Sequence, residues 1–111
     1  MQTSLIIIDN FYSNPYEVRE HALQQDFGVN GNYPGHRTVS FLNESTKEGI
    51  AKALRPHAGE VTDWHDYEGG YTGAYQYTLA SDRSWIHSDQ TTTWAGVLYL
   101  TPDAPLTGGT A

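Results

Sequence analysis

The chain of 111 residues contains no cysteine. Disulfide bonds, thiolate metal ligands and a cysteine nucleophile are therefore excluded, and histidine, carboxylate or water would have to hold any metal ion. No stretch is apolar over the ~20 residues that a transmembrane helix needs, so we expect no membrane partner. The N-terminal residues lack the basic segment and the length of a signal peptide, which makes a cytoplasmic location the default expectation.

Positive charge is also scarce. The chain has 6 Lys and Arg residues against 13 Asp and Glu residues, and its formal net charge is −7. So acidic a chain does not attract phosphate backbones, and the composition therefore argues against nucleic acid as a partner. Only 38% of the residues are hydrophobic, which is little for a domain that closes its own core. The length suits one domain or part of one.

The first part of the chain, residues 1–60, predicts one strand followed by helical segments. The apolar run over residues 5–8 is typical of a short buried strand. Asn14 and Pro15 are residue types preferred at the cap and at the first position of a helix, which we expect to continue to about Phe27. This part therefore combines strand and helix signals.

A second helix is expected further along the same part. Ser45 and Glu48 have the spacing of a capping box. Apolar residues then recur with helical periodicity, which predicts a helix over residues 46 to about 55. Pro56 interrupts the pattern near its end, and Gly59 is expected to stop the helix.

Signals for β structure dominate residues 61–111, where glycine and tyrosine are frequent. In the stretch before the turn at residues 81–84, side chains alternate so that Tyr75, Tyr77 and Leu79 share one face. A later stretch, residues 94–100, is apolar on both faces, which implies burial on both sides. Strands are expected over residues 37–42, 61–65, 73–79 and 94–100.

A His-x-Asp pair, His87 and Asp89, lies within residues 84–90, before the last of these strands. On an extended chain, residues two apart point to the same face, so an imidazole and a carboxylate would lie side by side. Two such ligands and one further histidine form the facial triad of non-haem Fe(II) oxygenases. A solvated strand end also explains a bare pair of this kind, so both interpretations stay open on the pair alone.

The wider pattern resembles a known superfamily. The segment Trp85-Ile86-His87-Ser88-Asp89 precedes the apolar stretch of residues 94–102, and Gly108-Gly109-Thr110 follows. This order is similar to that of the 2-oxoglutarate/Fe(II)-dependent dioxygenase superfamily, in particular its bacterial, phage and marine branch related to prolyl-hydroxylase-like and phytanoyl-CoA-hydroxylase-like enzymes. Residues 9–15 and 32–37 are also similar to the N-terminal part of that branch.

The resemblance implies a partial double-stranded β-helix, or jelly roll, of the α+β or mainly β class, with two N-terminal helices packed on the sheet. Residues 1–111 would form a single incomplete domain whose first jelly-roll strands lie in 61–111. The resemblance also implies that His87 and Asp89 bind Fe(II) and that 2-oxoglutarate is the cosubstrate. In the superfamily, a second histidine ligand and an Arg or Lys that binds 2-oxoglutarate lie further along, here beyond Ala111. We therefore expect a portion truncated at its C-terminus, and inactive alone.

Three further residues are candidates for contacts with cosubstrate or substrate. Tyr75 and Tyr77 precede the motif in a region that lines the cosubstrate pocket in similar enzymes, although an aromatic stripe in the core also explains them. Arg37 is a candidate substrate contact. The substrate, a small molecule or a peptide, is not specified by the sequence. None of the other histidines follows His87, so none matches the second histidine ligand; they are His21, His36, His57 and His65.

A second interpretation is a non-catalytic jelly-roll module with a binding or structural role. His87 and Asp89 would then be ordinary polar residues at a strand end. Unpaired strands and an exposed apolar face favour self-association, so a homo-oligomer is the partner that this interpretation predicts.

Overall fold

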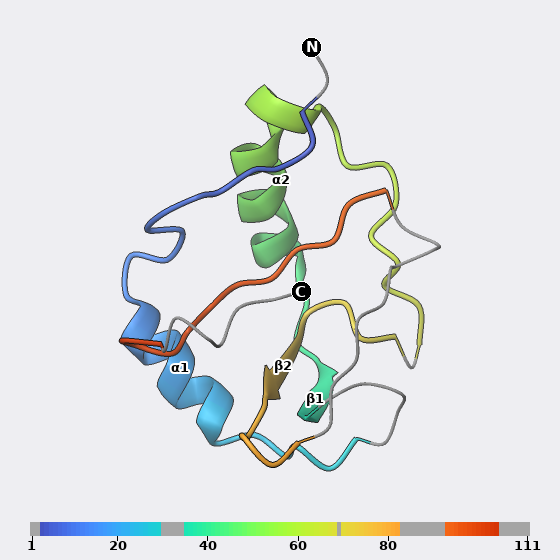
Figure 1. The fold of residues 1–111 in the computed structure, drawn as a ribbon. Coiled ribbons are helices and arrows are strands. Elements are labelled where there is room, and N and C mark those ends of the chain that lie inside the picture. Colours follow the sequence, from blue (N-terminus) through green and yellow to red (C-terminus); the bar gives the residue numbers. More distant parts are fainter. Residues whose placement is uncertain (1–2, 30–34, 69, 83–92, 105–111) are drawn as a thin grey trace.

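A computed structural model describes residues 3–29, 35–68, 70–82 and 93–104. Two helices and one two-stranded antiparallel sheet form in the described residues (Figure 1). A sheet of two strands is common to many folds, so it does not distinguish a jelly roll from other arrangements of helices and strands. In chain order the elements are α1 (Pro15–Leu23), β1 (His36–Ser40), α2 (Glu44–Ala58) and β2 (Ala74–Tyr77).

Helix α1 begins as predicted and ends early. The Asn14 side chain accepts a hydrogen bond from the Glu17 amide at 3.3 Å, which confirms the N-cap. The helix ends at Leu23, four residues before the predicted end. At this end the Gln25 side chain donates to the His21 carbonyl at 2.9 Å, while the Gln25 amide donates to Ala22. The side chain thus takes the carbonyl that the next helical turn would use, so the prediction to Phe27 was wrong.

Helix α2 is longer than predicted at both ends. Its N-cap is Asn43, whose side chain accepts from the Thr46 amide at 2.9 Å, so the capping box at Ser45 was wrong. Pro56 lies inside the helix rather than interrupting it, because a proline in the last turn removes only one backbone hydrogen bond. Gly59 confirms the predicted stop, with φ 79° and its amide donating to a carbonyl of the last turn.

Strand β1 overlaps the predicted strand 37–42 but begins one residue earlier and ends two residues earlier, and β2 lies within the predicted strand 73–79. They pair antiparallel, with His36 opposite Tyr77 and Ser40 opposite Ala74. The register shifts between Arg37 and Ser40, which marks a bulge. At the bulge the hydroxyl of Thr38, which is only 1% exposed, accepts a hydrogen bond from the Tyr75 amide at 3.0 Å. The Thr38 hydroxyl therefore replaces a backbone carbonyl as the hydrogen-bond acceptor between the strands at the bulge.

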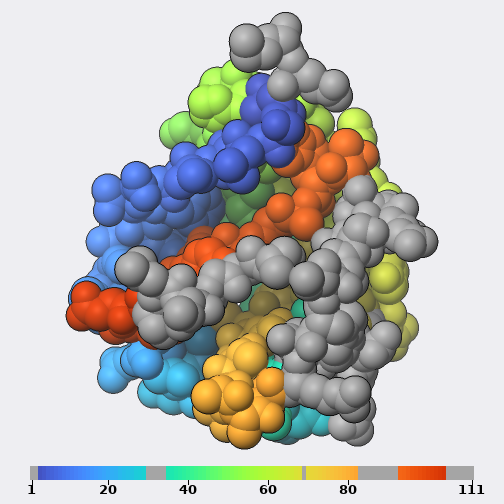
Figure 2. Space-filling view, viewed as in Figure 1, coloured from blue at the N-terminus to red at the C-terminus, as the bar shows by residue number. Residues whose placement is uncertain are grey.

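The other predicted strands do not form. Residues 5–8, 61–65 and 94–100 run as extended or irregular chain without strand pairing in the described part. Figure 2 shows segments 3–14 and 93–104 on one face of the molecule. The predicted burial was also wrong, because Ile7 is 77% exposed and Val97 is 63% exposed. A segment that is apolar on both faces needs a layer on each side, and two short helices and a two-stranded sheet do not supply both layers.

Burial is sparse in the described residues. Ala22 on α1 and Thr38 on β1 are the buried residues there. Aromatic rings pack against one another around the sheet and against His21 near the end of α1. Among the described helices, none has both the length and the apolar composition needed to cross a bilayer.

Candidate functional site

The β1–β2 sheet carries the three described residues that the sequence singled out. Arg37 lies on β1, and Tyr75 and Tyr77 lie on β2. The two proposed metal ligands, His87 and Asp89, lie outside the described residues. The structure therefore places the candidate contacts on one sheet but on opposite faces of it, because Arg37 is opposite Gln76, which alternates with Tyr75 and Tyr77.

Tyr75 is half-buried in an aromatic cluster. Its ring centroid lies 5.4 Å from that of Phe41 and 5.9 Å from that of His21, which comes from α1. Burial, and in smaller part the charge of Tyr12, raises the pKa of the Tyr75 phenol above its ordinary value. The cluster joins α1 to the sheet, and this packing is what the aromatic-stripe interpretation of Tyr75 expects.

The raised pKa of Tyr75 predicts a loss of stability in alkaline solution. The unfolded chain releases this proton near pH 10, while the folded chain holds it to higher pH. The contribution of Tyr75 to the free energy of unfolding is therefore fully present below its pKa in the unfolded chain. This contribution is lost as the pH rises through its pKa in the folded chain. Urea unfolding between pH 8 and 11 should show this decline, and Tyr75→Phe should reduce it. An equal decline in Tyr75→Phe would contradict the assignment, whereas Tyr16→Phe is a control at an exposed tyrosine.

Tyr77 is the last residue of β2 and belongs to a second group of aromatic rings. Its ring stacks on His36, with centroids 4.6 Å apart and planes 20° apart. Phe27 meets the same ring at 4.8 Å in an edge orientation. Tyr77 is 38% exposed, so part of the ring still faces solvent. Leu79, predicted on the same face, lies beyond the strand and is 54% exposed.

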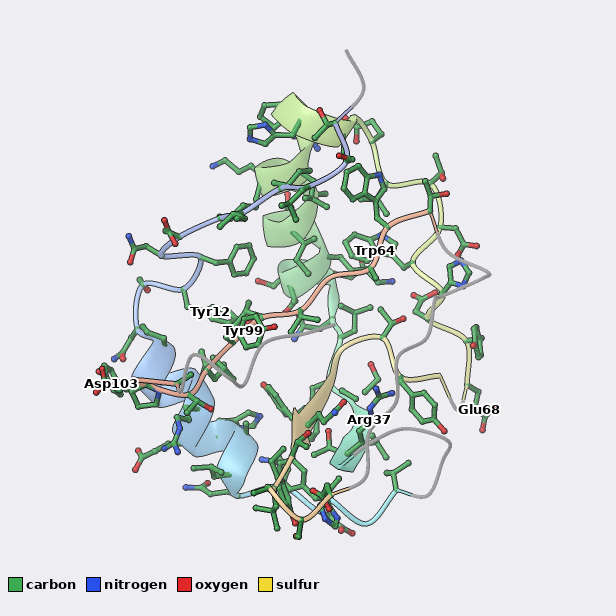
Figure 3. All side chains as sticks on the ribbon, in the orientation of Figure 1. Tyr12, Arg37, Trp64, Glu68, Tyr99 and Asp103 are labelled. Atoms are coloured by element: carbon green, nitrogen blue, oxygen red, sulfur yellow. The ribbon has the colours of Figure 1, made fainter. Side chains whose placement is uncertain are left out.

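Arg37 lies on β1, and two contacts hold its guanidinium in place (Figure 3). Its Nε donates to Oε1 of Gln76, the residue opposite in the ladder, at 2.7 Å. Its guanidinium carbon lies 4.9 Å from the ring centroid of Tyr71. A guanidinium fixed by a hydrogen bond and an aromatic face is suited to planar anions such as carboxylates.

In the part of the chain that the structure describes, the possible metal ligands come together only in pairs. No group of three or more histidine, aspartate or glutamate side chains gathers there in a way that could hold a metal ion. Two His–Asp pairs occur among the described residues: His36 Nε2 lies 3.6 Å from Asp82 Oδ1, and His65 Nε2 lies 3.5 Å from Asp63 Oδ2. Two ligands hold a metal ion loosely, so neither pair makes a metal centre by itself.

A charged contact that the sequence did not reveal joins α2 to the following segment. The Lys47 ammonium hydrogen-bonds the Asp66 carboxylate and lies 3.7 Å from Glu44. The hydrogen bond to Asp66 raises the pKa of Lys47, and the same bond lowers the pKa of Asp66. Beside this contact is an open hollow of about 390 Å³, lined by α2 residues and Trp64. Figure 3 shows Trp64 next to α2. The two partners are 19 positions apart, so no local pattern indicates the pair.

Neither a protein-family model, nor a characterised protein, nor a solved structure matches this chain. The functional argument therefore rests on the residues of the chain and on their arrangement. The sheet with Arg37, Tyr75 and Tyr77, followed along the chain by the His87–Asp89 pair, is the candidate site.

Proposed function

We propose that this chain is the N-terminal portion of a non-haem Fe(II)/2-oxoglutarate-dependent oxygenase, a hydroxylase with a jelly-roll fold. The observation that carries the proposal is the sequence from Trp85 to Thr110, in which His87-x-Asp89 precedes an apolar segment and a Gly-Gly-Thr turn. An imidazole and a carboxylate two residues apart on a strand provide two of the three protein ligands of the facial triad.

The roles of the residues follow from their chemistry. His87 and Asp89 would hold Fe(II), and the bound iron with 2-oxoglutarate would supply the oxidising chemistry. Arg37, held by Gln76 and Tyr71, would attract an anionic group of the substrate. Tyr75 and Tyr77 alternate with Gln76 along β2, so any contact they make with cosubstrate would be on the opposite face of the sheet from Arg37. Because two ligands bind a metal weakly, we expect residues 1–111 alone to form no succinate from 2-oxoglutarate.

Paramagnetic NMR with Mn²⁺ tests the metal pair even when binding is weak. Substoichiometric Mn²⁺ should broaden the amide signals of residues 86–90 first. His87→Asn should lower the apparent affinity by roughly tenfold or more, because loss of a hydrogen-bond partner to a metal ligand alone costs about 10- to 100-fold. The spectra also report whether the variant keeps the fold of the parent chain.

The chain contains its own matched control. Asp63 and His65 are also two residues apart, and their side chains form a His–Asp pair at 3.5 Å. His65→Asn makes the same chemical change as His87→Asn, and asparagine tolerates the positive φ of 52° at this position. Mn²⁺ binding should be unchanged in this control. Equal broadening around Asp63 and around His87 would show that the proposed pair is not special.

A non-catalytic module that self-associates is the alternative function, and the exposed apolar side chains favour it. Leu5, Ile7, Val97 and Tyr99 are each more than 60% exposed, on two segments that share one face (Figure 2). Large exposed apolar surfaces mark sites of association. Light scattering over a concentration series distinguishes the two: a monomer that binds Mn²⁺ at His87 supports the oxygenase, and a dimer without such binding supports the module.

A further inference from the structure

The hollow beside α2 takes no part in the proposed oxygenase chemistry. Its lining on α2 consists of residues spaced three or four positions apart, which therefore share one face of the helix: Glu44, Lys47, Glu48 and Ala51. Trp64, from the segment after the helix, completes the lining and lies next to α2 (Figure 3). The hollow of about 390 Å³ thus combines an aromatic ring and a small apolar residue with two carboxylates.

The cation among the described lining residues, Lys47, already has a partner. Its ammonium hydrogen-bonds the Asp66 carboxylate, and only 20% of the Lys47 side chain is exposed. This bond raises the pKa of Lys47 and lowers the pKa of Asp66, so both groups stay charged and cancel near neutral pH. Glu44 lies 3.7 Å from the same ammonium, but its side chain is 94% exposed, so water screens this contact. The two glutamates therefore leave the hollow negatively charged.

Glu44 and Glu48 lie four positions apart on α2, one helical turn from each other. Like charges at this spacing repel and destabilise a helix. Glu44 is in the first turn, where the helix dipole favours an acidic residue. Glu48 lies beyond that turn and makes no ion pair with any residue that the structure describes. A cation held in the hollow would offset the repulsion between the two carboxylates.

A guanidinium group fits the remaining features of the lining. It is planar and stacks on aromatic faces, and its fixed N–H donors match carboxylate oxygens. It is also more weakly hydrated than an ammonium, which matters in an open hollow that replaces only part of the water around a ligand. We propose that this hollow binds a guanidinium group, carried by the arginine side chain of a peptide or by a small guanidino compound. The site does not depend on the metal pair of the proposed oxygenase.

NMR titration with N-acetylarginine amide tests the site, at constant ionic strength so that screening does not change. N-acetyllysine amide carries the same charge and is the matched comparison. The arginine compound should shift the indole N–H signal of Trp64 and the amides of residues 44–51. It should bind about two- to fivefold more tightly than the lysine compound, because the guanidinium stacks on the ring. Equal affinities, or no shifts at these residues, would overturn the proposal.

Variants of the lining test which groups hold the ligand. Trp64→Leu should weaken binding of N-acetylarginine amide by about two- to fivefold, since the aromatic face is lost. Glu48→Gln should also weaken it by about two- to fivefold, and this exposed position tolerates the change if Trp64→Leu does not fold. Glu20→Gln, at an exposed position on α1, alters the net charge equally and should leave the affinity unchanged. Equal weakening in both glutamine variants would show attraction to the whole acidic chain, and would overturn the site.

Two further probes distinguish the sources of the guanidinium. Methylguanidinium represents a small guanidino compound, and acetyl-Gly-Arg-Gly amide represents a peptide. Tighter binding of the peptide, with shifts that extend beyond the lining residues, would support an arginine side chain as the ligand. Equal binding of the two probes would support a small compound. Shifts at the Trp64 indole with neither probe would overturn the proposal.

Discussion

Replacing Gly35 with alanine should destabilise the folded chain by several kcal/mol, and by more than the same replacement at Gly59. Gly35 has φ 80°, and a Cβ would lie 2.4 Å from the Tyr77 carbonyl oxygen and 2.6 Å from the Thr78 hydroxyl. We expect about 1–3 kcal/mol from backbone strain and about 1–3 kcal/mol from the collision. The carbonyl belongs to the backbone of β2, so relief requires separation of the two strands.

Gly59 supplies the comparison that isolates the collision. It has φ 79°, close to that of Gly35, but a Cβ there would meet nothing within 4 Å. Gly59 also has ψ −157°, a region that alanine hardly adopts, so Gly59→Ala should carry a full backbone strain without a collision. Urea unfolding of both variants should show that Gly35→Ala costs about 1–3 kcal/mol more than Gly59→Ala. Equal losses would mean that β1 and β2 do not approach each other as closely as the structure shows.

Replacing Thr38 with valine should cost about 1–3 kcal/mol of unfolding free energy, although the two side chains have nearly the same shape. Thr38 is 1% exposed, and its hydroxyl accepts a hydrogen bond from the Tyr75 amide at 3.0 Å. The hydroxyl also donates to the Val39 carbonyl at 2.6 Å. Valine would leave the Tyr75 amide without its acceptor at the bulge, where the ladder offers no replacement.

Thr38→Ser is the matched control for this prediction. Serine keeps the hydroxyl and removes one methyl group, so this replacement should cost about 0.8 kcal/mol of unfolding free energy. Amide exchange at Tyr75 should accelerate in Thr38→Val and stay close to the parent rate in Thr38→Ser. A larger loss in serine than in valine would show that packing, and not the hydrogen bond, is the contribution of Thr38.

The helix caps and the alternation in β2 could be predicted from the sequence because they depend on residues only a few positions apart. Asn14 caps α1 through the amide three residues ahead, and Gly59 ends α2 because glycine adopts a positive φ without strain. Alternation over residues 73–79 predicted β2 because a strand with one packed face has a period of two. The cap of α2 was misplaced by two residues, since Asn43 and Ser45 are both good caps and tertiary context selects between them.

Contacts between residues far apart in the sequence could not be predicted in this way. The ladder between β1 and β2, the bulge bridged by Thr38, and the His36–Asp82 contact join residues that lie far apart along the chain. Nothing in a local window specifies such pairings. The apolar composition of residues 94–100 indicated burial, but composition does not name the layer that would cover them, and most of those residues are exposed.

The sequence by itself determined the start of α1, the stop at Gly59, the acidic charge and the His87-x-Asp89 spacing that carries the functional proposal. These depend on residue type and on neighbours within a few positions. Only the tertiary structure decided that Arg37 is held between Gln76 and Tyr71 and that His36 faces Asp82. The physical reason is that hydrogen bonds and ring contacts act over a few ångströms of space, and folding determines which distant residues come within that range.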